Sequence, residues 1–205
     1  MKNWAIMFLY LVMGLSLSLM GDIYIMKKIK QRNKIHPIIG GCLCGLLGLK
    51  NGFSYDGLFY VIAIILLLVI SVIDWKTYEI PPELPFLLGI LGGTHMLLHL
   101  SDWMTYVIGM GCVSLLFLLI YYLSGGQQIG GGDIKLMAAA GLLLGWPLTI
   151  LSLFLGSLFG SVIHLALMKF KEKSRVLAFG PYLSAGIICA MLFGEEVITW
   201  YLGFL

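Results

Sequence analysis

The sequence predicts an all-α fold, a polytopic integral membrane bundle of about eight transmembrane helices. Of the 205 residues, 60% are hydrophobic and only 11% are charged, and the mean hydropathy is +0.99. Soluble domains carry about 25% charged residues, so this chain lacks the polar surface that a water-facing exterior needs. One membrane span needs about 17–25 apolar residues, so a chain of this length leaves no room for a separate soluble domain.

Eight apolar runs follow one another along the chain. They cover residues 4–26, 36–49, 57–73, 84–100, 103–123, 134–145, 147–168 and 177–193. The first run lacks a small-residue cleavage site, so we interpret it as a retained span. The runs at 36–49 and 134–145 are short and are expected to be tilted, re-entrant or extended by their neighbours. We interpret residues 1–205 as one membrane-embedded unit, in which 1–35 form the first helix and a basic loop and 36–205 form the core.

The basic residues predict how the chain is oriented. Five of them follow the first run, at Lys27, Lys28, Lys30, Arg32 and Lys34, and such a cluster is typical of a cytoplasmic loop. The N-terminus is therefore expected outside the cytoplasm, and the loops at 27–35, 74–83, 124–133 and 169–176 inside. These loops, together with Lys135, hold eleven of the thirteen Lys and Arg residues.

Two aspartates at cytoplasmic ends of spans need an explanation, because charge in an apolar layer is unfavourable. Asp74 ends a long apolar run, and Asp133 follows Gly130, Gly131 and Gly132. Each aspartate could simply cap a helix. However, three glycines have no Cβ and permit positive φ, so an extended peptide could approach Asp133 closely.

Two carboxylates within hydrogen-bonding distance share a proton, because both cannot ionise easily. One member can then activate a water while the other protonates the carbonyl oxygen or the leaving amine. Asp74 and Asp133 therefore predict the chemistry of an aspartic protease at the membrane surface.

Four segments carry a resemblance to a known family. Residues 130–136, GGGDIKL, resemble the G-x-G-D signature of membrane aspartyl proteases, in the form typical of bacterial type IV prepilin peptidases. Residues 138–146, residues 179–183 (FGPYL) and the segment from Ile73 through Pro81 are similar to further parts of that family, in the same order. The FGPYL segment favours the bacterial branch over peptidases of archaeal preflagellins. Pro82 departs from the pattern, which commonly has Asn or Asp there.

The resemblance implies a peptidase that cleaves basic leader peptides from prepilin or pseudopilin-like precursors, at the cytoplasmic face of a bacterial inner membrane. Its partners would be these precursors and membrane lipid, with no nucleic acid, no cofactor and no metal. Longer family members also methylate the new N-terminus and carry paired C-x-x-C motifs. The four cysteines here are dispersed, so neither that activity nor a zinc site of the cysteine type is predicted.

Four charged residues near the aspartates are further candidates for shaping the site. Lys76 and Lys135 each lie two residues after an aspartate, where they could anchor the chain to headgroups or act on the aspartates and the substrate. Both interpretations stay open. Glu79 and Glu83 follow Asp74, and we hypothesise that they attract a basic leader.

Two alternatives to a peptidase rest on other residues or on another role for the carboxylates. His95 and His99 could share a helix face as metal ligands, but the sequence shows no acidic third ligand nearby. A non-enzymatic transporter could use intramembrane carboxylates to relay protons or to bind a cation. It would be expected to show inverted repeats and midplane sites, whereas we find no internal repeat and both aspartates lie toward one face.

Overall fold

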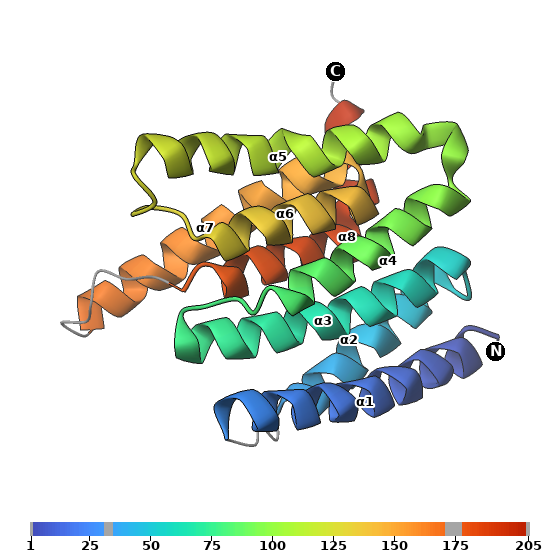
Figure 1. Ribbon diagram of the computed structural model, residues 1–205. Helices are drawn as coiled ribbons and strands as arrows, with labels where there is room; N and C mark the ends of the chain where they lie inside the picture. The colour runs from blue at the N-terminus through green and yellow to red at the C-terminus, as the bar shows by residue number, and fades with distance from the viewer. Residues whose placement is uncertain (1, 31–34, 171–177, 204–205) are drawn as a thin grey trace.

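A computed structural model describes residues 2–30, 35–170 and 178–203 of the chain. Within these ranges the protein forms eight α-helices and one short 3-10 helix, and the helices run broadly along one direction (Figure 1). The elements are α1 (Lys2–Ile29), α2 (His36–Asn51), α3 (Tyr55–Thr77), α4 (Glu83–Leu98), η1 (Leu100–Asp102), α5 (Trp103–Leu123), α6 (Gly131–Leu144), α7 (Trp146–Phe170) and α8 (Gly180–Leu202).

The predicted all-α membrane fold is confirmed, since each apolar run coincides with one helix. Five helices, α1, α3, α5, α7 and α8, are long and apolar enough to cross a membrane. Helices α2, α4 and α6 have 16, 16 and 14 residues. At about 1.5 Å per residue they fall short of an apolar layer about 30 Å thick. The apolar span predicted at 84–100 corresponds to α4, which ends at Leu98.

Helices α3 and α8 form the interior of the bundle. Half of the residues in the most apolar stretch of each are buried, against 22% in α1, α5 and α7. Side chains such as Ile70 and Leu183 are fully buried, whereas Phe8, Leu115 and Phe154 on the outer helices are exposed. An apolar exterior over many helices is what a multi-pass membrane protein presents to lipid.

Helix α6 is seated in the bundle by direct backbone contact. A Cβ atom on Gly141 would lie 2.0 Å from the carbonyl oxygen of Gly109 in α5. Gly92 of α4 approaches the backbone of Leu143 in a similar way, with 2.9 Å from its ideal Cβ to the Leu143 nitrogen. Small residues allow such close helix approach in membranes. The position of α6, and of Asp133 at its start, is therefore tightly defined.

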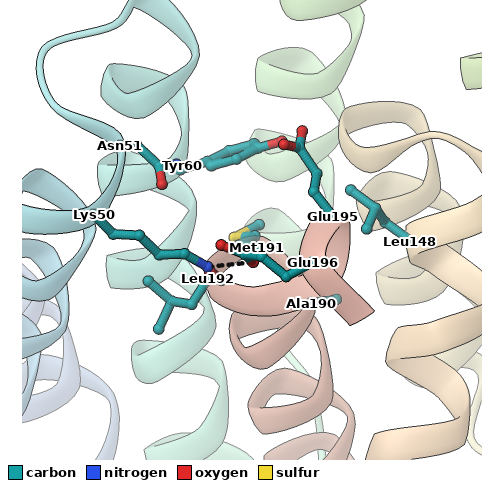
Figure 2. Close-up of a pocket in the computed structure, with 9 residues that line it drawn as sticks. All are labelled: Lys50, Asn51, Tyr60, Leu148, Ala190, Met191, Leu192, Glu195 and Glu196. Atoms are coloured by element: carbon teal, nitrogen blue, oxygen red, sulfur yellow. Dashed lines mark hydrogen bonds and ion pairs between the residues drawn. The ribbon is translucent and has the colours of Figure 1, made fainter. Parts of the chain in front are cut away.

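The last helix extends farther than the sequence predicted. The expected span at 177–193 is corrected to Gly180–Leu202, so Glu195 and Glu196 lie in α8 and not in a loop. The Lys50 ammonium at the end of α2 pairs with the Glu196 carboxylate and donates to the Leu192 carbonyl oxygen (Figure 2). This ion pair gives Lys50 a partner at the end of the bundle where basic residues are otherwise scarce.

The orientation of the bundle remains a prediction, and a labelling experiment tests it. Residues 31–34 and 171–176 of the predicted basic loops lie outside the described residues. In a chain with its native cysteines replaced by alanine, we introduce Glu79→Cys or Asp102→Cys, both at exposed positions. A membrane-impermeant maleimide added to spheroplasts should label Asp102→Cys directly, and Glu79→Cys only after permeabilisation. The reverse pattern would contradict the orientation.

Candidate active site

Asp74 lies in the last turn of α3 with only 4% of its surface exposed. The helix ends because Tyr78 adopts a left-handed conformation, φ 57°, and its N–H donates to the Asp74 carbonyl oxygen at 2.8 Å. A left-handed residue at this position is a common helix terminator. The apolar run before Asp74 is buried in the bundle, so α3 places the carboxylate at one end of the buried interior.

The beginning of α8 faces the Asp74 carboxylate. The backbone N–H of Gly180 donates to Asp74 Oδ2 at 3.0 Å. A Cβ at position 180 would lie 2.8 Å from that oxygen, so only glycine allows the approach. The first N–H groups of a helix have no partner within the helix and carry partial positive charge. The FGPYL segment thus places a helix N-terminus on the first carboxylate.

Asp133 lies in the first turn of α6 and is 9% exposed. Gly130 is the N-cap residue, with an extended backbone at φ −75° and ψ 143°. The Asp133 carboxylate accepts a hydrogen bond from the backbone N–H of Gly130, which is the return contact of a capping box. Each of the two carboxylates therefore faces the N-terminus of a helix.

The two carboxylates lie close enough to act on each other electrostatically. Asp133 lies outside the five membrane-spanning helices, and its pKa is raised to about 7. Burial is the larger cause, because it disfavours the charged form, and the negative charge of Asp74 adds to it. Near neutral pH the pair can therefore hold a single proton.

The glycines at 130–132 do not adopt the positive φ that the sequence suggested. Gly130 is extended at negative φ, and Gly131 and Gly132 lie in the first turn of α6. A Cβ on Gly131 would meet nothing within 4 Å, whereas one on Gly132 would lie 2.8 Å from the Cβ of Ile80. Gly132 is thus required for close packing, whereas position 131 faces open space.

Ile80 packs between the starts of α6 and α8. Its Cδ1 would lie 3.1 Å from a Cβ on Gly180, and its Cβ lies against Gly132. The Ile80-Pro81 segment therefore separates the two helix N-termini that face the carboxylates. Pro82 is the N-cap of α4 and provides no side-chain cap. An Asn or Asp at this position could accept a hydrogen bond from the first turn.

The four other charged candidates are all exposed. Neither Lys76 nor Lys135 is among the groups that shift the pKa of Asp133. The structure therefore does not support the idea that these lysines change the acidity of Asp133. Lys76 instead borders a groove on the outside of α3, lined by Ile35, His36, Ile39, Leu68, Ser71, Val72, Trp75, Lys76 and Pro181. Glu79 lies in the loop after α3, and Glu83 begins α4.

Two further aspartates lie in polar clusters that were not predicted from the sequence. Asp22 in α1 is 3% exposed and interacts electrostatically with His36, which is buried at the start of α2. The signal was present, since Asp22 is an acid within an apolar run, as Asp74 is. Asp56 lies beside His95 and His99. The acidic neighbour of this histidine pair, which the sequence does not reveal, thus comes from α3.

Comparisons with known proteins agree on one family. The family model described as "Type IV leader peptidase family" matches residues 61–165. The chain is similar to proteins named prepilin leader peptidase/N-methyltransferase from three bacteria. Identity is 30% to that of Bacillus subtilis (strain 168), 32% to that of Legionella pneumophila and 28% to that of Pseudomonas aeruginosa.

These alignments cover 80%, 75% and 86% of this chain, respectively. They cover 67%, 56% and 63% of the three relatives, so the chain spans roughly half to two thirds of their length. No solved structure matches the chain significantly. The matched region includes both Asp74 and Asp133.

The glycine contacts predict a contrast in stability. Gly180→Ala and Gly132→Ala introduce methyl groups at 2.8 Å from Asp74 Oδ2 and from Ile80, and should each lower the free energy of unfolding by about 1–3 kcal/mol. Gly131→Ala, the matched control, enters open space and should leave it unchanged or slightly higher. Thermal unfolding of the purified proteins in detergent measures all three. A loss in Gly131→Ala equal to the others would contradict this account of the site.

Proposed function

The chain belongs to the type IV leader peptidase family, and from this premise we propose that it is an aspartic endopeptidase that removes leader peptides from prepilin-type precursors. One observation carries the proposal: two buried carboxylates, Asp74 and Asp133, interact where two helices begin. With the predicted orientation, cleavage takes place at the cytoplasmic face of a bacterial inner membrane. The proposal is limited to the peptidase, although the relatives' names also carry a methyltransferase.

The proposed mechanism follows from the single proton of the pair. The ionised carboxylate takes a proton from a water molecule as that water attacks the scissile carbonyl carbon. The protonated carboxyl group donates its proton to the carbonyl oxygen, and the partner that took the proton from water then donates it to the leaving amine as the C–N bond breaks. The first carboxylate regains a proton from a hydroxyl of the tetrahedral intermediate, so the pair again holds one proton. The N–H groups that face Asp74 and Asp133 favour the ionised form of each. The roles belong to the pair, because a shared proton has no fixed owner.

We propose that the leader reaches the pair along the exposed charged surface at this end of the bundle. Glu79 and Glu83 are exposed beside it and would attract a basic leader. The groove bordered by Trp75, Lys76 and Pro181 lies next to Asp74 and Gly180 in the chain and offers an apolar surface for an extended peptide. In this proposal Lys76 contacts the substrate backbone, and Lys135 anchors α6 at the headgroups.

Replacement of either aspartate tests the mechanism. In cells that co-express a prepilin, Asp74→Asn and Asp133→Asn should each slow leader removal by about 10²–10⁴-fold, because an acid or base is lost. Asp102→Asn makes the same chemical change at an exposed position at the other end of the bundle, and should cleave normally. Processing is followed by the size shift of the prepilin, with membrane levels of each variant matched. Near-normal cleavage by either active-site variant would contradict the mechanism.

The role of the two glutamates is tested by salt dependence. The double variant Glu79→Gln/Glu83→Gln should cleave a prepilin several-fold more slowly at low ionic strength, because a long-range attraction for the basic leader is lost. At about 1 M salt the Debye length falls to about 3 Å, so the difference from the unmodified chain should disappear. Equal rates at low salt would remove both glutamates from the proposal.

A further inference from the structure

A second polar cluster lies at the opposite end of α3 from Asp74. Asp56 is in the first turn of α3, His95 is in the last turn of α4, and His99 is the residue that ends α4. Asp56 Oδ1 lies 3.1 Å from His95 Nε2 and 3.4 Å from His99 Nε2. One ligand atom from each residue lies within 4.8 Å of the other two. Three potential metal ligands therefore converge from two helices.

The hydrogen bonding of His99 defines the state of its ring. Its Nδ1 lies 3.0 Å from the carbonyl oxygen of His95, and because a carbonyl oxygen only accepts, Nδ1 carries a hydrogen. In the neutral ring, Nε2 then has a lone pair and faces a carboxylate oxygen. Two electron-rich atoms at 3.4 Å repel unless a cation, either a proton on Nε2 or a metal ion, lies between them.

The two separations from the Asp56 carboxylate fit a metal ion. Zinc binds histidine nitrogen and carboxylate oxygen at about 2.0–2.2 Å in tetrahedral geometry, which places neighbouring ligand atoms about 3.3–3.6 Å apart. The separations of 3.1 and 3.4 Å from Asp56 Oδ1 lie close to this range, and the ligand atoms of the two histidines lie within 4.8 Å of each other. The contact from His99 Nδ1 to a backbone carbonyl is also the usual way in which a metal-binding histidine is oriented.

The three-residue cluster is enclosed by aromatic rings on the side of His95 and open to the surface on the side of Asp56 and His99. His95 is 3% exposed, and the rings of Phe59, Tyr60 and Tyr106 lie 5.1, 6.4 and 5.5 Å from its ring centre. Such packing fixes the ring of His95 and excludes water behind it. The side chains of Asp56 and His99 are 48% and 36% exposed, which gives an ion a path from the surface. The open side leaves room for water as a fourth ligand.

We propose that Asp56, His95 and His99 bind a divalent transition metal ion, with Zn²⁺ as the best match. Two imidazoles and one carboxylate are a ligand set that zinc sites in proteins use. The ion would fasten the start of α3 to the end of α4. Asp56 precedes Asp74 by 18 residues on the same helix, about 27 Å along its axis, so this site is separate from the aspartate pair. The inference does not depend on the proposed peptidase.

Zinc binding to the full chain tests the proposal. The protein is purified in detergent through a tag without histidines, stripped with a chelator and titrated with Zn²⁺. We expect one tight zinc per chain and a higher thermal midpoint with zinc. Asp56→Asn and His99→Asn should each weaken binding at least tenfold and lose the thermal shift. Asp102→Asn, an exposed carboxylate in neighbouring η1, is the matched control and should bind as the unmodified chain does.

A second measurement keeps the test decisive if a variant folds poorly. Co²⁺ added to the stripped, unmodified chain should give the visible absorption of tetrahedral cobalt with nitrogen and oxygen ligands, and Zn²⁺ should displace it. Octahedral or absent cobalt absorption would overturn the proposal, as would equal zinc binding by Asp56→Asn, His99→Asn and the control. In those cases a proton bridges His99 and Asp56.

Discussion

The end of the bundle that holds Asp74 and Asp133 depends on the hydrogen bond from the Gly180 N–H to Asp74. A carboxylate in an apolar bundle costs about 2.5–3.5 kcal/mol on insertion scales, and here a backbone donor offsets part of that cost. Asp133 is held in the same manner by the start of α6. Three parts of the chain therefore have to meet at this end of the bundle. They are the end of α3 at left-handed Tyr78, the beginning of α6 and the beginning of α8.

The two ends of the bundle are held together differently. At the end that holds Asp74 and Asp133, dipoles of helix N-termini act on the two carboxylates. No opposite charge is among the groups that shift the pKa of Asp133. At the other end, side chains pair across helices: Lys50 with Glu196 (Figure 2), and Asp56 with two histidines. Side-chain pairs fasten α2 to α8 and α3 to α4 there.

Much of this arrangement could be predicted from the sequence, for physical reasons. Long apolar runs must form helices in lipid, because backbone groups there need internal partners, and scarce charge made Asp74 and Asp133 conspicuous. The conformation of Gly130, Gly131 and Gly132 could not be predicted, because glycine adopts either sign of φ and tertiary packing decides. The neighbour of His95 could not be predicted either. Asp56 lies 39 residues away on another helix, and the lateral order of helices leaves no periodic signal in one chain.

The side chain of Ile80 has a consequence for how this site can diverge. It occupies the space between Gly132 and Gly180, so its volume sets how far apart the beginnings of α6 and α8 stand. Each beginning holds one carboxylate, and the proton affinity of the pair depends on their separation. Ile80 thus influences both carboxylates through the spacing of the two helices. Exchanging Ile for Val or Leu would retune the acidity of the pair while leaving every polar group in place.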